Sequence, residues 1–334
     1  MGHPYDWNQI ADGAHGAPHA HFGDPRRELD AAQTGAVVCP LSHFELLRFS
    51  GADAQTFLQA QLTCDVLKVT PTAARYGGYC TSKGRLIADF LLMRTPQAYL
   101  MHLPAESGAV LAERLRKFVL RAKVQIGRET GLRAIGIAGP DAVALLQQSV
   151  GESPRLPLES VQFPATTLLC LPGGSFLAVA PEPDVARLWD VLARQATPAG
   201  MDCWNWLQIR AGIPWITAAT REQFVPQMVA LDAIGGVDFQ KGCYPGQEII
   251  ARTRYLGEVK RGLHFGHCDG PAAAGDALLR ADGQSCGMVV NAAPAPGGGS
   301  DLLAVAQTGM DGDLLRLGSA DGPDVRIAQP SSAR

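Results

Sequence analysis

The chain has 334 residues, with 29 Lys and Arg, 32 Asp and Glu, and a formal net charge of −3. Hydrophobic residues make up 46% and charged residues 18%, a globular composition that excludes a disordered or collagen-like chain. The nearly balanced charge gives no reason to expect a general polyanion-binding protein. The length predicts about two or three domains, each able to bury its own core.

Residues 1–35 are rich in Gly, His and Pro and contain no apolar signal core. We therefore expect a flexible leader that lies outside the fold. Its four histidines could chelate a metal, but a polar tail is the simpler interpretation, and we expect no metal site. The chain has no run of about 18 apolar residues, so we expect no membrane span.

The eight cysteines include no Cys-x-x-Cys pair, which argues against a zinc ribbon or a thioredoxin motif. Without a secretory signal, a disulfide framework is not expected, and we predict a cytoplasmic protein. Most of the cysteines lie in apolar strings and are interpreted as small core residues. Cys243 is the exception.

One segment of the chain repeats. The sequence FSGADA at 49–54 returns as IAGPDA at 137–142, an offset of 88 residues. In both copies an apolar strand meets a glycine that permits a turn, and an Asp two residues later can cap a helix. The pattern predicts a duplicated α+β body over residues 36–260.

The elements expected after each copy follow the same order of strands and then a helix. After the first copy they are strands around 75–80, 86–93 and 98–103 and a helix at about 106–120; after the second they are strands at 166–171 and 175–180 and a helix at about 183–196. Over residues 261–330, short β-prone runs alternate with Gly, Asp and Pro. This texture predicts a small C-terminal β-barrel.

The least generic segment is DFQKGCYPGQE at 238–248. Its glycines permit close backbone approach to a ligand, and Lys241 or the arginines at 252 and 254 could favour the thiolate of Cys243. Gln247 and Glu248 can hydrogen-bond a polar heterocycle, and the run from Gly246 could open a helix. The alternative is a glycine-rich turn around a structural cysteine.

The string KGCYPGQE, followed by ART and GEVKR, resembles the signature of the YgfZ family of folate-binding proteins. The family is similar to factors for iron–sulfur cluster maturation and is related to the aminomethyltransferase (T-protein) of the glycine cleavage system. The resemblance extends from about residue 36 and includes SGADAQTFLQAQLTCDV, RAGIP and FVPQ. It implies two ferredoxin-like units around a central cavity, with a C-terminal barrel.

The resemblance also implies that reduced folate, tetrahydrofolate or a one-carbon derivative, binds in that cavity. The family's cysteine corresponds to Cys243, and two folate-associated tryptophans correspond to Trp204 and Phe44. Phe44 keeps a stacking face but lacks the indole donor. The alternative for both rings is a role as core aromatics. The resemblance places the folate contacts of the signature on Lys241, Gly242, Tyr244, Gly246, Gln247, Glu248, Arg252 and Arg254.

In the T-protein, a catalytic Asp belongs to an Asp-Asp pair. Here only Asp89 matches the pair, and Ala88 takes the other place, which argues against aminomethyl transfer. Asp89 could hydrogen-bond a pterin or face solvent from a strand. The basic run from Arg252 to Arg261 could bind folate carboxylates, bind an RNA backbone or form a solvated edge.

Three functions are consistent with the sequence. The favoured one is a tetrahydrofolate-binding protein that assists maturation or repair of iron–sulfur proteins through the thiol of Cys243. The second is a folate-dependent one-carbon transferase that uses Asp89 or Glu248 as acid or base. The third is a tRNA-modification factor, and here the acidic net charge argues mildly against direct RNA binding.

Overall fold

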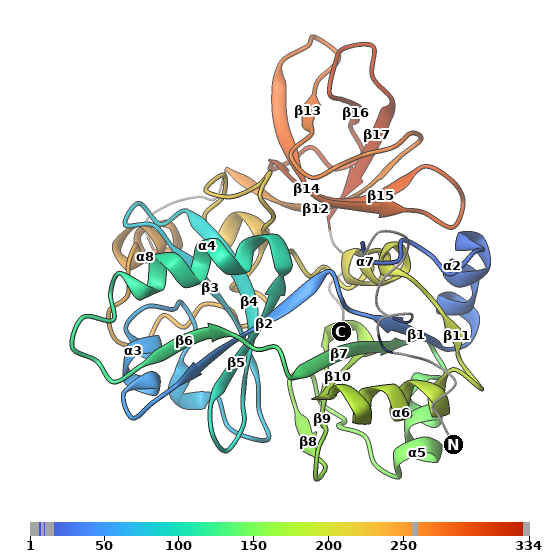
Figure 1. The fold of residues 1–334 in the computed structure, drawn as a ribbon. Helices are drawn as coiled ribbons and strands as arrows, with labels where there is room; N and C mark the ends of the chain where they lie inside the picture. Colours follow the sequence, from blue (N-terminus) through green and yellow to red (C-terminus); the bar gives the residue numbers. More distant parts are fainter. Residues whose placement is uncertain (1–6, 8–9, 11–16, 256–259, 330–334) are drawn as a thin grey trace.

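The structure, a computed structural model, describes residues 7, 10, 17–255 and 260–329 of the chain. Three parts are visible in Figure 1: a five-stranded sheet, a six-stranded sheet and a closed β-barrel. Within the described ranges, no helix has both the length and the apolar character needed to cross a membrane.

The first sheet has the strand order β3-β4-β5-β2-β6, with antiparallel neighbours throughout. Its elements are β2 (Phe44–Ser50), α3 (Ala54–Gln59), the short 3₁₀ helix η2 (Val66–Lys68), β3 (Arg75–Cys80), β4 (Leu86–Arg94), β5 (Tyr99–Pro104), α4 (Ala105–Arg116) and β6 (Gln125–Arg128). The sheet is buried on both faces. One face packs under α3 and α4, and the other faces the central core of the molecule.

The second sheet has the order β11-β1-β7-β10-β9-β8. Its elements are α2 (Pro25–Thr34), β1 (Val37–Pro40), β7 (Leu132–Ala138), α5 (Ala142–Val150), β8 (Ser160–Gln162), β9 (Thr167–Cys170), η3 (Pro172–Gly174), β10 (Phe176–Pro181), α6 (Glu182–Leu192) and β11 (Thr197–Pro198). Strand β1 precedes β2 along the chain but pairs with β7 of this sheet. The chain therefore crosses between the two sheets twice, once at 41–43 and once at 129–131.

The third part is a closed barrel of order β12-β15-β14-β13-β16-β17. Its strands are β12 (Arg261–Cys268), β13 (Ala277–Leu279), β14 (Ser285–Pro294), β15 (Ser300–Gln307), β16 (Leu314–Leu317) and β17 (Asp324–Ala328). The sequence prediction of a C-terminal barrel is confirmed. Strand β13 has only three residues, which is too short to stand out as a β-prone run in the sequence.

Helix α7 (Met201–Arg210) lies between the barrel and the second sheet, as Figure 1 shows. The indole Nε1 of Trp206 donates to Asp301 Oδ2 at 2.8 Å, which joins this helix to β15. The connection from α7 to the barrel contains η4 (Pro226–Val229) and α8 (Gln247–Tyr255), and α8 lies beside the first sheet.

The N-terminal segment differs from the expected leader. Residues 25–34 form α2, which begins with Asp24 capping the amide of Arg27 and with Pro25 in the first turn. Glu28, Leu29 and Ala32 are buried, and Glu28 accepts hydrogen bonds from the amides of Phe22 and Gly200. The apolar spacing of this single short helix was masked by its charged composition. The histidines at 3 and 15 lie outside the described residues.

The two expected helices after the repeated segments are present but shorter than expected. Helix α4 ends at Arg116 and α6 at Leu192, about four residues earlier than the sequence predicted in each case. After α4 the chain turns through Leu120, which has a positive φ of 43°. Burial ends with Leu115, so no apolar face remains to extend the helix.

Candidate functional site

Asp89 lies in the middle of β4 and is 1% exposed. It alternates in step with Leu91 and Met93, so its side chain faces the central core rather than α3 and α4. The amide of Ile216 donates to Asp89 Oδ1 at 2.7 Å. Burial raises the pKa of Asp89 to about 7, although the hydrogen bond from the Ile216 amide acts to lower it. The solvent-facing alternative for Asp89 is thus wrong.

Four aromatic rings gather on the same central face of the first sheet. The rings of Phe44 and His102 stack with centroids 4.5 Å apart at 14°. Trp215 meets Phe44 edge-on at 4.9 Å and Tyr76 at 6.1 Å. Trp215 comes directly before Ile216, so this short segment delivers both the indole ring and the amide that binds Asp89. Side chains from four strands and this segment form an aromatic cluster around a buried carboxyl group.

Several polar atoms of this interior have no hydrogen-bond partner among the described residues. They are Tyr76 Oη, His102 Nδ1, Trp215 Nε1 and both side-chain amide atoms of Gln208 on α7. Burial lowers the pKa of His102 to about 3 and raises that of Tyr76 well above its usual range, so both rings are neutral. Since buried polar groups are normally paired, so many unpaired atoms in one core indicate that a ligand or ordered water completes their hydrogen bonds.

A cavity of about 280 Å³ opens beside the cluster, at the two crossings between the sheets. Phe44 and His102 form part of its wall, and Glu129 and Arg133 supply charge. Because the crossings bring loops of both sheets together, the cavity is bordered by residues far apart in sequence. Its aromatic wall suits a flat, polar heterocycle, and its rim carries charges of both signs, from Glu45 and Glu129 and from Arg128 and Arg133.

Of the cluster, Phe44 and His102 line this cavity, whereas Asp89, Tyr76, Trp215 and Gln208 lie in the core beside it and do not line it. The donors and acceptors of this core fit a reduced folate. A pterin ring is flat and carries both donors and acceptors, which the orphaned Trp215 Nε1, Tyr76 Oη and Gln208 amide can match. The Asp89 carboxyl, with its pKa near neutrality, can donate or accept. Tyr76, His102, Trp215 and Gln208 were not singled out from the sequence. The only signal was the position of Trp215 just after the RAGIP string.

Trp204 lies apart from the aromatic cluster. It is on α7, is 1% exposed, and its six-membered ring covers Gly136 of β7 so closely that a Cβ there would lie 2.3 Å from the ring. It is not among the residues that line the 280 Å³ cavity. In this structure Trp204 packs as a core aromatic, and its contact with folate stays a prediction.

The signature segment forms a loop that leads into α8. Cys243 is exposed, and Gly242 beside it has open space at its Cβ position. Tyr244 is 7% exposed and packs into the central core. Gly246 has φ +82°, and a Cβ there would lie 2.5 Å from the carbonyl oxygen of Thr81 and 2.8 Å from the Cα of Gly84. The loop thus rests on the turn between β3 and β4, with its thiol outward.

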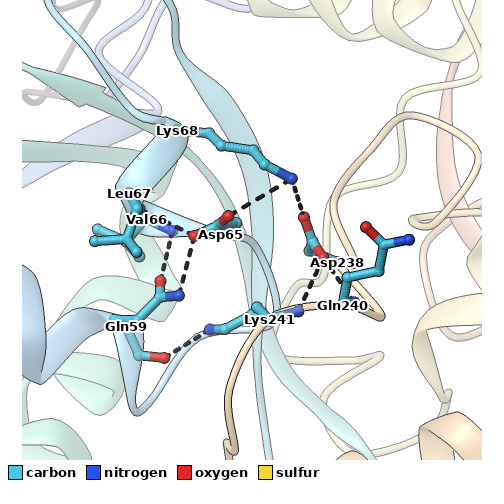
Figure 2. Close-up of polar contacts among 8 residues, drawn as sticks. All are labelled: Gln59, Asp65, Val66, Leu67, Lys68, Asp238, Gln240 and Lys241. Atoms are coloured by element: carbon cyan, nitrogen blue, oxygen red, sulfur yellow. Dashed lines mark hydrogen bonds and ion pairs between the residues drawn. The ribbon is translucent and has the colours of Figure 1, made fainter.

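Lys241 fastens this loop to the first sheet (Figure 2). Its ammonium donates to the carbonyl oxygen of Gln59 at 2.6 Å, as Figure 2 shows. It also donates to the carbonyl oxygen of Leu62 at 2.5 Å and lies 5.1 Å from the centroid of the Tyr244 ring. Burial lowers the pKa of Lys241. Among the described residues, both hydrogen bonds of this ammonium are with the end of α3 and the residues just after it, so Lys241 acts as an anchor in this structure.

Asp238 provides a second fastening point in Figure 2. Its Oδ2 lies 2.6 Å from Lys68 Nζ, and its Oδ1 accepts from the amides of Gln240 and Lys241. Burial raises the pKa of Asp238, but the bonds from Lys68 and these amides outweigh it, so the net pKa is below its usual range. Two segments that the resemblance picked out separately, QAQLTCDV and DFQKGCY, are one structural unit.

The remaining predicted residues lie on α8. Glu248 has an 85% exposed side chain and lies 3.9 Å from Arg252, a surface pair one helical turn apart. The guanidinium of Arg254 lies 4.1 Å from the centroid of the Phe239 ring. The expected helix is confirmed from Gln247. Its charged residues face outward rather than into the 280 Å³ cavity.

The predicted residues therefore fall into two groups. Phe44 and Asp89 belong to the interior aromatic cluster, whereas Cys243, Glu248 and the arginines of α8 belong to the exposed signature loop and its helix. Over the described residues, no group of three or more His, Cys, Asp or Glu side chains is placed to hold a metal ion.

Comparison with known proteins agrees with this architecture. A family model described as the GCVT N-terminal domain matches residues 7–168. The crystal structure of the glycine cleavage system aminomethyltransferase T from Bartonella henselae superposes with a TM-score of 0.76 at 17% identity, covering 91% of this chain and 88% of that one. The chain thus has a GcvT-like fold with a closed C-terminal barrel.

Two curated relatives are each named tRNA-modifying protein YgfZ. The protein from Colwellia psychrerythraea is 36% identical over 224 residues, 67% of this chain and 69% of the relative. The protein from Escherichia coli O157:H7 is 34% identical over 242 residues, 72% of this chain and 74% of the relative. This chain belongs to the YgfZ family.

Proposed function

We propose that the protein binds tetrahydrofolate, or a one-carbon derivative of it, in the cavity beside the aromatic cluster. The observation that carries this proposal is the set of buried polar atoms without partners around Asp89. A dry apolar core would not keep an indole N–H, a phenol and an imidazole nitrogen unpaired, because each costs about 1–3 kcal/mol. A bound pterin would satisfy them.

Each residue of the cluster has a distinct task in this proposal. Phe44 and His102 offer a stacked face to the pterin, and Trp215 donates from Nε1. Asp89 holds the proton at one edge of the ring, since its pKa lies near neutrality. The folate supplies, when bound, a carrier for a one-carbon group. Trp204 supports the cavity from α7 through the core.

We further propose that Cys243 is the functional thiol in the maturation or repair of iron–sulfur proteins. Its exposure suits reaction with, or transient ligation toward, a client or assembly protein. Gly242 leaves room for a partner to approach, and Gly246 and Tyr244 fix the loop. Gln247, Glu248, Arg252 and Arg254 present polar groups on the same helix and would meet the partner or a folate tail.

The body at 36–260 is inferred to be two duplicated ferredoxin-like units around the folate cavity, followed by the barrel at 261–330. The corresponding strand orders β3-β4-β5-β2-β6 and β8-β9-β10-β7-β1 support this inference. We place the protein in the cytoplasm, in keeping with eight cysteines that are all free thiols.

A rescue assay tests the thiol. A bacterium depleted of its own homologue would receive the intact protein, Cys243→Ala, or the buried control Cys286→Ala, and a cluster-dependent enzyme would be assayed. Rescue by the intact and Cys286→Ala forms only is expected. Equal rescue by Cys243→Ala would reduce this thiol to a structural residue.

Titration with tetrahydrofolate, followed by calorimetry, tests the cavity separately. Trp215→Phe keeps the ring but removes the orphaned donor, so we expect affinity to fall about tenfold, the equivalent of one hydrogen bond to a polar ligand. The matched control Trp189→Phe changes a buried tryptophan of α6, in a separate core cluster beneath the second sheet, and should leave affinity unchanged. Equal affinity for all three proteins would remove the cluster from the binding site.

A second candidate, a folate-dependent one-carbon transferase, is favoured by one observation. The Asp89 carboxyl has a pKa of about 7, which suits a general acid or base. Turnover that disappears in Asp89→Asn while folate binding persists would support it. The curated relatives are named for tRNA modification, a role that could arise directly or through a cluster-dependent tRNA-modifying enzyme.

A further inference from the structure

A second, larger cavity lies away from the aromatic cluster, in a groove between the first sheet and the barrel. Its volume is about 510 Å³. The β3–β4 turn contributes Arg85, the end of α8 contributes Thr253, and the start of the barrel contributes Lys260 and Arg261. Its walls therefore come from both the body and the barrel, and cations stand on both sides.

The positive charge of the groove is not neutralised by the described residues. No Asp or Glu of the described chain lines the groove. Arg85 Nη1 donates only to the carbonyl oxygen of Gln223 at 2.5 Å. Glu222 lies next to Gln223 in the chain, but its carboxylate is paired with Arg114 at 2.8 Å. Three cations without a carboxylate partner among the described residues favour an anionic occupant.

The floor of the groove is apolar. Phe224 and Met228 come from the segment before η4 and from η4 itself, and Met288 comes from β14. Phe224 is held in place because its carbonyl oxygen accepts from the amide of Leu86 at 2.8 Å. Phe224 is only 4% exposed, so the apolar surface of the floor comes mainly from the partly buried Met228 and Met288. Cations beside such a floor suit a ligand that alternates anionic groups with uncharged ones, as single-stranded nucleic acid does. An acidic peptide would use the cations but not the floor.

The groove borders the signature loop. Gly84, which precedes Arg85, packs against Gly246 so closely that a Cβ added at Gly246 would lie 2.8 Å from the Cα of Gly84. Helix α8 starts four residues after Cys243, and its last turn contains Thr253, which lines the groove. Since nine helical residues span about 13 Å, a strand in the groove would pass within a few nucleotides of the thiol.

We propose that this groove binds a single-stranded segment of RNA, with Arg85, Lys260 and Arg261 on its phosphates. The inference rests on the proposed function in one respect, because it places an RNA beside the functional thiol. It does not depend on folate. It revises the expectation from the net charge of −3, since the charge of a whole chain does not describe one groove.

Fluorescence anisotropy with a labelled 12-nucleotide oligouridylate tests the proposal on the full-length protein. The double variant Lys260→Ala/Arg261→Ala removes two groove cations whose side chains are exposed. The matched control Arg187→Ala/Arg326→Ala removes two exposed arginines from α6 and β17. We expect at least a tenfold loss of affinity for the groove variant and less than a twofold loss for the control.

Salt dependence gives a second readout. Three phosphate contacts predict a slope of log K against log salt of about −2, and the groove variant should lose about 1.4 of it. Equal binding by groove and control variants, no binding by the intact protein, or stronger binding of a labelled hexaglutamate peptide would each overturn the proposal.

The test also separates this inference from the proposed function. Cys243→Ala and Trp215→Phe should bind the oligonucleotide as well as the intact protein does, because neither residue lines the groove. Loss of rescue with retained RNA binding would therefore speak to the thiol alone. Loss of RNA binding in Lys260→Ala/Arg261→Ala with normal folate binding would speak to the groove alone.

Discussion

The aromatic cluster and the signature loop differ in how their buried polar groups are hydrogen-bonded. In the cluster, buried side chains keep atoms without partners, among them Trp215 Nε1 and His102 Nδ1. In the loop, the buried ammonium of Lys241 is fully engaged with backbone carbonyls, and the reactive candidate Cys243 is exposed. The first region is built to be completed by a ligand, whereas the second is complete without one and displays a thiol.

The largest effect expected from this contrast is the pH dependence of stability at Asp89. Its pKa is about 7 when folded, against a usual value of 3.8. A carboxyl whose folded pKa is raised contributes stability below the unfolded value, and that contribution is lost as pH rises through about 7. The loss amounts to about 4 kcal/mol in the free energy of unfolding.

Urea denaturation of the intact protein and of Asp89→Asn, from pH 4 to pH 8, measures this loss. Asn cannot ionise, so the difference between the two proteins should swing by about 4 kcal/mol in favour of the variant as pH rises. Buried His102 has the opposite dependence, since its pKa is lowered to about 3, but it cancels in the difference. A constant difference across this range would show that Asp89 is ionised throughout.

The glycines of the loop provide the next test. Gly246→Ala would place a Cβ against the backbone of Thr81 and Gly84 at a φ of +82°, and we expect a loss of about 3 kcal/mol in stability. Gly242→Ala is the matched control, because open space surrounds its Cβ position. Thermal unfolding of both variants checks the pair, and equal melting temperatures would mean that the loop does not rest on the β3–β4 turn.

The sequence was informative where local residue patterns determine the secondary structure. The repeated glycine turn predicted β2 with α3 and β7 with α5, and the apolar runs predicted β3 to β5 and most of the barrel. The partners of Lys241 could not be predicted, because the carbonyls of Gln59 and Leu62 lie 179 or more positions away. The same holds for the contact between Trp215 and His102, because the two rings come from segments that are far apart in the sequence.

Lys241 itself should give a smaller loss. Lys241→Met keeps the length of the side chain but leaves the carbonyls of Gln59 and Leu62 without their donor, which we expect to cost about 2 kcal/mol. The measurement is the free energy of unfolding in urea, with the exposed lysine variant Lys117→Met as the control. We expect Lys241→Met to lower rescue activity because the loop loses its anchor, and not because a positive charge near the thiol is lost. If Lys241→Met left stability unchanged, Lys241 would not be an anchor, and the prediction that it contacts the ligand would stand.

The smallest effect is expected on the exposed side of α8. Glu248 lies 3.9 Å from Arg252 with an 85% exposed side chain, and such surface pairs contribute less than about 0.5 kcal/mol. Glu248→Ala should therefore leave unfolding unchanged, as should Arg252→Ala, whereas a contact with a client or with folate would appear only in rescue or binding. A stability loss above 1 kcal/mol would mean that the outer face of α8 contributes to the fold, as Lys241 does. The exposed side of α8 would then not differ from the anchored part of the signature loop.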